Sequence, residues 1–416
     1  MNKEFLDKIL GSEFVCTCGK THRVTPEVVE ICRGAVNMLP KLLKDHGKTK
    51  PIMVCDENTY SAAGKAVEGL CEFYGVAVLS PEDLHANEKG VSDARSLIEL
   101  GADVYVAVGS GTIHDITRFI AHEDGIPFIS IPTAPSVDGF VSATSAMTWN
   151  GCKKSFSTCA PIAMLGDIDI VANAPMRLIS SGVGDLLGKF TAIVDWKIAN
   201  LLTGEYYCEY IVELEKNVLK NTIDNIDKLK KRDGDTIANL MYGLVLSGLA
   251  MEMAGVSRPA SGGEHYISHL LEMKVLGDTN YGYHGEKVGV GLMIACDEYR
   301  KVAKRLESFE SPRHYEFPEK LVIKMFGEMA DTILAENRED TLDGVSIDVL
   351  KEKKNEILEA IYSLPTPEKI VEWLGACGAP TSLEEIKIPN DFRDDICFWS
   401  PFVRNKLTFM RLSKII

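Results

Sequence analysis

Three polar residues that lie far apart in the chain have the types needed to hold a single metal ion. Asp185 follows Gly-Val-Gly, His265 follows Gly-Glu, and His284 precedes Gly-Glu. A carboxylate and two neutral imidazoles suit Zn²⁺, Ni²⁺ or Fe²⁺ and leave one coordination position free for a substrate, so the chemistry would be that of a Lewis acid. The alternative is that Asp185 caps a helix over residues 186–200, because spacing alone does not place it near the histidines.

The histidines of this set have a close neighbour. His265 and His269 are four residues apart and share one face if residues 264–273 form a helix. Such a pair either binds one metal together or directs one ring at the metal and the other at a substrate. Three of the nine histidines, at positions 265, 269 and 284, fall within twenty residues, which favours a common site over separate structural roles.

A loop rich in small residues runs from Gly109 to Asp115, directly after the apolar segment Val104–Val108. If the segment is a strand and the loop opens a helix, free backbone N–H groups and the helix dipole attract a pyrophosphate. The loop lacks the Gly-x-Gly-x-x-Gly fingerprint, and a plain strand-to-helix turn explains it equally well.

A second polar loop, Pro132–Gly139, follows the next apolar segment. Ligands of open α/β sheets bind at the carboxyl ends of the strands, so two such loops predict a nucleotide site there. Asp56 follows another apolar segment, where its carboxylate would accept from a ribose hydroxyl and repel a 2′-phosphate. That position favours NAD over NADP; the alternative is an Asx-turn.

Two kinds of element must position these residues. The first 170 residues or so alternate short β-branched runs with helical stretches, as in βα units of a parallel sheet; the predicted strands are Pro51–Cys55, Val76–Leu79, Val104–Val108 and Phe128–Ile131. Later segments carry apolar residues at helical spacing, namely Glu209–Lys230, Thr236–Ala254, Glu286–Leu306 and Pro318–Leu334. We therefore expect an α/β domain over residues 1–172 and an all-helical domain over 173–416, with Pro175 opening a helix and the active site in the cleft between them.

Composition limits the partners of the chain. It has 416 residues, 45% of them hydrophobic, and a net charge of −15. An acidic chain is a poor ligand for nucleic acid or anionic lipid. Because no run of about 18 apolar residues is evident, we expect a soluble cytoplasmic protein without a membrane span.

The cysteines have one local cluster. The chain has eleven cysteines, an odd number, and most lie in apolar runs, so we expect reduced thiols and no disulfide framework. Cys16 and Cys18, together with His22, could form part of a zinc site, but a matching second half is missing from the sequence around them. A β-hairpin edge with a Gly turn is therefore the preferred interpretation.

Five motifs in order resemble one known family. They are residues 109–115 (GSGTIHD), 132–139 (PTAPSVDG), 182–189 (GVGDLLGK), 257–265 (SRPASGGEH) and 284–285 (HG). The sequence resembles the sn-glycerol-1-phosphate dehydrogenases, within the superfamily of iron-type alcohol dehydrogenases, glycerol dehydrogenases and dehydroquinate synthases. The resemblance covers most of the chain and implies a Rossmann-like N-terminal domain, an all-α C-terminal domain and a deep cleft.

The resemblance also implies residue roles. Asp185, His265 and His284 would bind one divalent metal ion (Zn or Ni, or else Fe), and Asp138 and His269 would face the substrate, with His269 as proton shuttle. The residues around NAD(P) would be Asp56, Gly109, Ser110, Gly111, Thr112, Asp115, Thr133, Ser136 and Ser142. A substrate phosphate needs cations, for which Lys153, Lys154 and Arg258 are the candidates.

The implied activity is a metal-dependent interconversion of dihydroxyacetone phosphate and sn-glycerol 1-phosphate by hydride transfer with NAD(P)H, in a homodimer. Three alternatives stay open: a dehydrogenase of an unphosphorylated polyol such as glycerol, a cyclising lyase of the dehydroquinate synthase type, and a non-catalytic NAD-binding regulator. The intact ligand set argues against the last of these.

Overall fold

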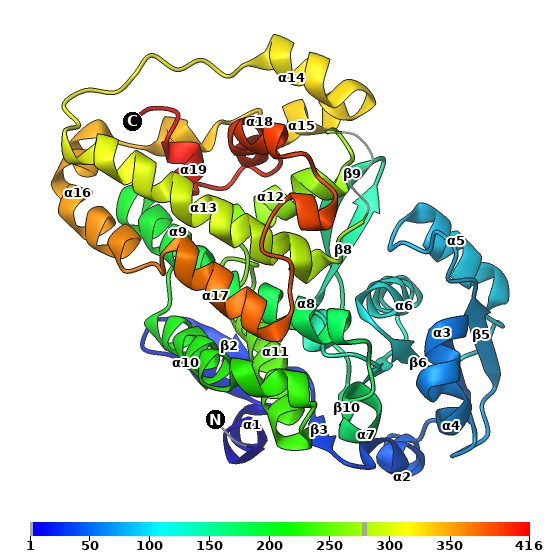
Figure 1. Ribbon diagram of the computed structural model, residues 1–416. Helices are drawn as coiled ribbons and strands as arrows, with labels where there is room; N and C mark the ends of the chain where they lie inside the picture. Colours follow the sequence, from blue (N-terminus) through cyan, green and yellow to red (C-terminus); the bar gives the residue numbers. More distant parts are fainter. Residues whose placement is uncertain (1–2, 277–280) are drawn as a thin grey trace.

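A six-stranded parallel sheet organises the first part of the computed structural model, which describes residues 3–276 and 281–416 (Figure 1). All five pairings in the sheet are parallel, so the carboxyl ends of its strands share one edge. In sheet order the strands are β3 (Val28–Cys32), β10 (Ala163–Asp167), β7 (Phe128–Pro132), β6 (Val104–Gly109), β4 (Pro51–Asp56) and β5 (Gly75–Leu79).

Helices cover both faces of this sheet, because its central strands are apolar on both sides. On β4, Met53 and Cys55 pack into one core with α2 (Leu39–Asp45) and α4 (Lys65–Glu68). Ile52 and Val54, on the other face of β4, pack into a second core with α5 (Glu88–Leu97) and α6 (Gly111–Asp124). The helices of this part are α2 (Leu39–Asp45), α3 (Glu57–Thr59), α4 (Lys65–Glu68), α5 (Glu88–Leu97) and α6 (Gly111–Asp124).

The four predicted strands are confirmed, since they fall within β4, β5, β6 and β7. The sequence does not predict β3 and β10, because Glu30 interrupts the first and Gly166 and Asp167 end the second. It also does not predict the antiparallel hairpin of β8 (Thr144–Trp149) and β9 (Cys152–Ser157), in which polar residues alternate with apolar ones.

Beyond β10 the described residues, 168–276 and 281–416, contain helices and no strands, which agrees with the predicted α/β-then-α layout. The helices are α7 (Ile168–Val171), α8 (Met176–Leu187), α9 (Lys189–Thr203), α10 (Glu209–Asn225), α11 (Gly234–Ala254), α12 (Gly263–Glu272), α13 (His284–Glu307), α14 (Glu319–Phe326), α15 (Ala330–Glu336), α16 (Ile347–Tyr362), α17 (Pro367–Cys377), α18 (Arg393–Trp399) and α19 (Phe409–Leu412).

Most predicted helices are confirmed, with corrections at three places. Residues 318–334 are not one helix: Gly327, with φ of 52°, lies at a break between α14 and α15. Asp185 does not cap a helix over 186–200, because it lies inside α8, and α9 starts at Lys189. Pro175 precedes α8 as its N-cap instead of occupying the first helical position.

The N-terminal segment packs against the edge strand β3 and the helical part. It comprises α1 (Lys3–Ile9) and the hairpin of β1 (Glu13–Val15) and β2 (Thr21–Arg23). Leu6, Ile9 and Val24 are buried in the same core as side chains of α10 and α11, and Figure 1 shows α1 beside these helices. The boundary at residue 172 stays a prediction. By their packing, residues 3–24 adjoin the helical part.

One helix, α11, is long and apolar enough to cross a membrane by length and composition. From the sequence we expect no such span. Of the apolar window in α11, 72% is buried inside the protein, as is typical of a core helix.

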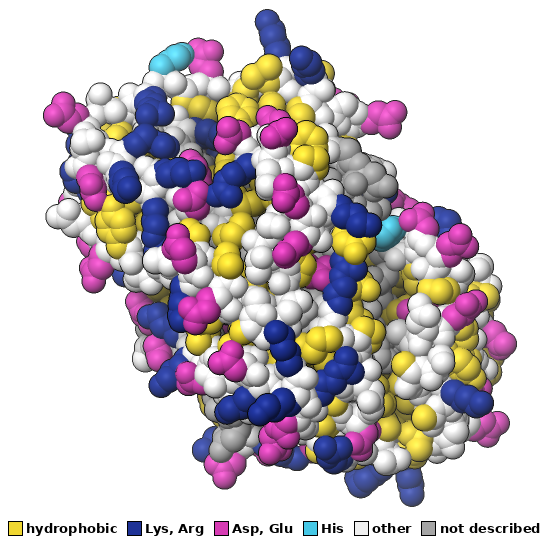
Figure 2. Space-filling model, viewed as in Figure 1, with side chains coloured by type: hydrophobic (Ala, Val, Ile, Leu, Met, Phe, Trp, Pro, Cys, Tyr) yellow, Lys and Arg dark blue, Asp and Glu magenta, His cyan; other side chains and the backbone are white. Residues whose placement is uncertain are grey.

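Charged side chains of both signs are spread over the molecular face seen in Figure 2. Lys and Arg intermingle there with Asp and Glu, in keeping with a chain whose net charge is −15. A charged ligand must therefore be attracted by local groups instead of a broad field.

Candidate metal and nucleotide site

Asp185, His265 and His284 converge in space. They come from α8, α12 and α13, and their ligand atoms all lie within 4.8 Å of one another. His265 Nε2 is 3.5 Å from Asp185 Oδ1, and the ring centroids of the two histidines are 5.2 Å apart. One carboxylate and two imidazoles facing a common point are a donor set that a divalent transition metal accepts.

Glycines allow the helices that carry these ligands to cross at close range. A Cβ on Gly184 would lie 2.2 Å from the carbonyl oxygen of Gly285, and a Cβ on Gly285 would lie 1.9 Å from that of Ser181. Only glycine fits at such a backbone contact. The Gly-Asp and His-Gly pairs in the sequence therefore have a steric reason: they bring α8 and α13 together so that Asp185 and His284 meet.

Two buried glutamates orient the histidines. Glu264 Oε1 is 2.7 Å from His265 Nδ1, and Glu272 Oε1 is 2.8 Å from His284 Nδ1. When Nδ1 of each ring donates to a carboxylate, Nε2 is left with a lone pair for a metal. The carboxylates thus fix both the tautomer and the direction of the two rings.

Asp185 is held ionised by its surroundings. Its Oδ1 accepts from Lys189 Nζ at 2.9 Å, and its Oδ2 accepts from the backbone N–H of Asp138 at 3.0 Å. Burial alone would raise the pKa of Asp185, but the positive charge of Lys189 outweighs it and holds that pKa well below its usual value. Asp185 therefore presents a carboxylate.

Asp138 and His269 lie beside this centre. Asp138 Oδ2 is 2.7 Å from Lys189 Nζ and accepts from Ser247 Oγ at 3.0 Å. The His269 ring centroid is 6.1 Å from that of His265, and its Nδ1 is buried without a hydrogen-bond partner among the described residues. Burial holds the pKa of His269 well below its usual value, so the ring is neutral.

A cavity of about 970 Å³ connects these residues to the polar loops of the sheet. From the helical side it is lined by His265 and His284 of the metal set, together with His269 and Asp138. From the sheet side the predicted nucleotide residues that line it are Ser110, Gly111, Thr112, Asp115, Ser136 and Ser142. The N-terminus of α6 therefore opens into the same cavity as His265 and His284, while Asp185 is buried beside them.

The other predicted nucleotide residues are not among those that line the cavity; they are Gly109, Thr133 and Asp56. Gly109 ends β6, and its carbonyl accepts from the N–H of Thr133 at 2.9 Å. Asp56 caps α3 through a reciprocal pair of 2.9 Å hydrogen bonds with Thr59. This cap corresponds to the Asx-turn that is the alternative role of Asp56 in the sequence. The cap uses Oδ1 of Asp56 and leaves its other carboxylate oxygen without a role in the cap.

The three cations predicted to bind a phosphate differ in position. Lys153 lines the cavity, and its Nζ is 2.7 Å from Glu272 Oε2. Lys154 is its neighbour on β9 and, because side chains of a strand alternate, is outside the described lining. Arg258 is 1% exposed, and its guanidinium is occupied by Glu205 at 2.6 Å and by the carbonyl of Leu407 at 2.8 Å. The structure therefore does not bring Lys154 and Arg258 to the cavity with Lys153.

Other cations line the cavity and were missed by sequence reasoning. Arg404 donates to Ser155 Oγ at 3.2 Å, and Lys406 donates to Ser257 Oγ at 3.1 Å. Burial, assisted by the nearby Arg258, lowers the pKa of Lys406 to about 8. Both residues follow α18 near the C-terminus, where no sequence motif marks them.

Glu264, Glu272 and Lys189 were also missed, although each had a local signal. Lys189 stands four residues after Asp185, and Glu272 stands seven after His265, so in a helix each pair shares a face. A search for carboxylates on the face of the histidine helix would have found Glu272.

Comparisons with known proteins show which chains this one is similar to. A family model described as iron-containing alcohol dehydrogenase matches residues 30–175. A relative from Bacillus licheniformis, named glycerol-1-phosphate dehydrogenase (NAD(P)+), is 34% identical over 98% of this chain and 93% of its own. A relative of the same name from Halalkalibacterium halodurans is 38% identical over 71% of this chain and 76% of its own.

The fold has solved counterparts. A crystal structure described as a probable glycerol dehydrogenase from Sinorhizobium meliloti superimposes with a TM-score of 0.63 at 18% identity, covering 93% of this chain and 95% of the other. At that identity the likeness concerns the fold alone, which is an α/β region followed by a helical region.

Proposed function

Because the chain belongs to the glycerol-1-phosphate dehydrogenase family, we propose that it interconverts dihydroxyacetone phosphate and sn-glycerol 1-phosphate by hydride transfer with NAD(P)H. The observation that carries the proposal is the shared cavity. It joins a three-ligand metal set, the N-terminus of α6 and several cations within about 970 Å³. A metal-assisted reduction of a phosphorylated ketone needs each of these parts.

The metal set fits a resident divalent ion, for which we propose Zn²⁺ or Ni²⁺. Asp185 is ionised, and Glu264 and Glu272 leave the Nε2 atoms of His265 and His284 free to coordinate. When bound, the ion supplies a Lewis acid that polarises the substrate oxygen at C2. Lys189 contributes by keeping the Asp185 carboxylate in place at 2.9 Å.

The dinucleotide would lie along the carboxyl edge of the sheet. The first N–H groups of α6, at Gly111 and Thr112, face the cavity and would bind the pyrophosphate, helped by the helix dipole. Ser110, Asp115, Ser136 and Ser142 would complete the contacts to the dinucleotide, with Thr133 directly after β7. The carboxylate oxygen of Asp56 that the helix cap does not use favours NAD over NADP. When bound, the cofactor supplies the hydride.

His269 is our candidate for moving the proton. Its neutral ring lies beside both metal-site histidines, and its Nδ1 has no hydrogen-bond partner in the described part of the chain. It would pass a proton between the C2 oxygen and the cavity, while Asp138, tied to Lys189 and Ser247, would orient a substrate hydroxyl.

The substrate phosphate would be bound by Lys153, Arg404 and Lys406, which line one cavity with the metal set. Because the pKa of Lys406 is lowered to about 8, its ammonium is charged below that pH and loses its charge above it. We therefore expect KM for dihydroxyacetone phosphate to rise by about tenfold as the pH passes 8. Lys406→Arg should flatten that profile, and initial rates from pH 7 to pH 9.5 measure it.

The decisive test is the rate of NADH oxidation with dihydroxyacetone phosphate, compared with dihydroxyacetone at equal concentration. Chelation should abolish the rate and Zn²⁺ or Ni²⁺ should restore it, and chiral analysis should identify sn-glycerol 1-phosphate as product. Equal turnover of the unphosphorylated ketone would indicate a polyol dehydrogenase. Full activity of metal-free protein would refute the mechanism.

Three further expectations belong to this proposal: a homodimer, a cytoplasmic location, and a division of the chain near residue 172 into a nucleotide-binding and a metal-binding domain. The family resemblance supports them. Light scattering tests the first, and cell fractionation tests the second. Limited proteolysis tests the third, because it should cleave close to residues 173–175.

A further inference from the structure

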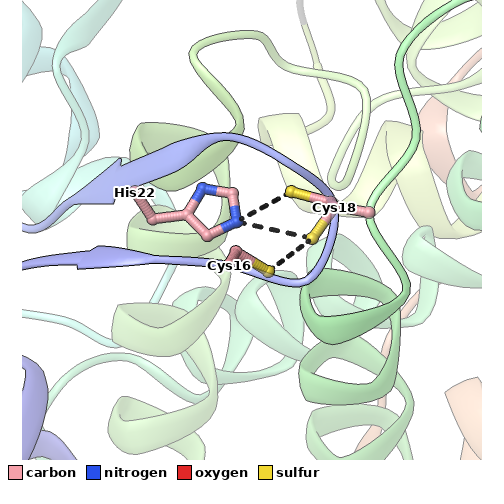
Figure 3. Close-up of side chains that lie close together, drawn as sticks. Cys16, Cys18 and His22 are labelled. Carbon is pink, nitrogen blue, oxygen red and sulfur yellow. Dashed lines mark hydrogen bonds between the residues drawn. The ribbon is translucent and has the colours of Figure 1, made fainter.

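A second cluster of metal-ligating side chains lies at the N-terminal hairpin. Cys16, Cys18, His22 and Cys208 each offer one ligand atom, and these atoms lie within 4.8 Å of one another. Figure 3 shows Cys16, Cys18 and His22 turned towards one another at the end of the hairpin. Cys208 lies 186 residues after His22 and just before α10. Cys208 is the further ligand that a zinc site needs and that the sequence around the hairpin lacks.

The spacing of the four atoms is that of a tetrahedral site. Cys16 Sγ is 3.7 Å from Cys208 Sγ, and His22 Nε2 is 3.6 Å from Cys18 Sγ and 3.4 Å from Cys208 Sγ. Zinc–sulfur and zinc–nitrogen bonds of about 2.3 and 2.0 Å put tetrahedral ligand atoms roughly 3.8 Å apart for two sulfurs and roughly 3.5 Å apart for sulfur and nitrogen. The observed separations match both values.

Groups outside the cluster prepare it for a metal. His22 Nδ1 is 2.8 Å from the carbonyl oxygen of Met253, so Nδ1 donates and Nε2 keeps its lone pair for the cluster. Tyr206 Oη is 3.4 Å from Cys18 Sγ, where its O–H can donate to the sulfur. His22 and Cys208 are fully buried, and Phe14 and Tyr210 pack against the His22 ring.

We propose that Cys16, Cys18, His22 and Cys208 bind a structural Zn²⁺, separate from the metal of the cavity. Binding replaces the three thiol protons, which pass to solvent, by three sulfur–zinc bonds, while neutral His22 adds a nitrogen–zinc bond; nothing is oxidised or reduced. Four protein ligands leave no open position, so this ion has no substrate. The β-hairpin predicted from the sequence is present, with its turn at Gly19 (φ of 85°), and Cys208 supplies the ligand that the sequence around the hairpin lacks.

The ion would fasten the N-terminal hairpin to the helical part of the protein. Three ligands come from residues 16–22, and the fourth lies at the start of α10, while the carbonyl that orients His22 comes from α11. The hairpin strands are only three residues long each and pair with each other alone. A hairpin this short is held weakly by its own backbone pairing. An ion bound by both His22 and Cys208, which are 186 residues apart in the sequence, would therefore contribute much to holding the hairpin on the helical part.

Cobalt binding tests the proposal, because thiolate ligands give Co²⁺ a strong near-ultraviolet charge-transfer band that carboxylate and imidazole ligands do not. Reduced, chelator-treated wild-type protein is titrated with Co²⁺ and then with Zn²⁺. We expect a thiolate band that reaches its full height within two equivalents per chain, because the cavity site also accepts Co²⁺, and that disappears when Zn²⁺ displaces Co²⁺. A folded, fully reduced wild-type protein without this band would overturn the proposal.

Variants locate the band. Cys208→Ser should abolish it and lower the Tm by several degrees, whereas Cys32→Ser, an exposed cysteine on β3, should change neither. If Cys208→Ser does not fold, the wild-type titration still decides. A disulfide is the competing use of these cysteines: protein denatured without reductant would then show two free thiols fewer than its eleven cysteines, and that result would also refute a zinc site. The test is independent of the proposed dehydrogenase, because it requires no activity.

Discussion

The two clusters of metal-ligating residues differ in chemistry and in surroundings. The Asp185 cluster uses oxygen and nitrogen donors, has three ligands and opens into the large cavity. The hairpin cluster uses three sulfurs and one nitrogen, has four ligands, and none of its residues is among those lining that cavity. An incomplete shell facing a cavity suits catalysis, and a complete shell in a packed core suits stability.

The residues that surround the ligands also differ between the two clusters. Around the first cluster they are charged: Glu264, Glu272 and Lys189 form ion pairs or charged hydrogen bonds with its ligands. Around the second they are a backbone carbonyl, a phenol and aromatic rings, including Tyr206 and Phe14. Charged neighbours tune how strongly a ligand donates, whereas neutral ones only fix its position. The first site is therefore expected to respond far more to single charge changes.

Removing one ligand from each cluster is the sharpest test of this difference. We expect His284→Ala to lower kcat to about a thousandth of the wild-type value, because the Lewis acid is lost, while the cobalt–thiolate band is unchanged. Cys208→Ser should do the reverse. Steady-state rates and cobalt spectra measure both, with the exposed His122→Ala as control. Loss of both signals in either variant would mean that the clusters are not independent.

The residue beside the open cluster should separate rate from metal binding. His269→Ala should keep the cavity metal and lower kcat by about 10²-fold, because a positioned proton carrier is lost while Asp185, His265 and His284 remain. Metal analysis and kcat on the same sample measure this. If metal content falls together with the rate, His269 is a ligand and the open cluster has four members instead of three.

The sequence predicts the open cluster far better than the closed one, for a physical reason. Asp185 and His284 each stand next to a glycine in a motif, since the close crossing at Gly184 and Gly285 leaves a local trace in the chain. Cys208, in contrast, directly precedes α10 in a segment without a motif. Its contact with His22 exists only in the folded protein. Pairing across 186 residues leaves no local signal.

The same limit explains the misplaced cations. In the sequence, Lys154 is a candidate because it adjoins Lys153, and Arg258 because it stands just upstream of the segment that holds His265. Strand alternation directs Lys154 away from Lys153, and Glu205 occupies Arg258. Arg404 and Lys406 reach the cavity from the C-terminal end of the chain, which the topology alone determines. The fold class and the strands β4 to β7 were within reach because buried strands have a local apolar pattern.

The charged neighbours of the open cluster can be tested one at a time. Glu272→Gln should weaken metal binding in the cavity by about 10-fold to 100-fold, because the amide no longer holds the His284 ring through a charged hydrogen bond. Competition with a chelator of known affinity measures this. The exposed Glu328→Gln is the matched control. An unchanged affinity would show that Glu272 serves Lys153 instead of the metal ligand.

The helix crossing offers the mildest test, which should again affect only the open cluster. Gly285→Ala puts a methyl group 1.9 Å from the Ser181 carbonyl, so α8 and α13 must move apart, and we expect a loss of about 1–3 kcal/mol in the free energy of unfolding. Gly375→Ala, in α17, has open space around its Cβ and should stabilise by about 0.4–1 kcal/mol. Urea unfolding measures both. In Gly285→Ala the cavity metal should bind more weakly while the cobalt–thiolate band stays intact, because the hairpin cluster does not depend on this crossing.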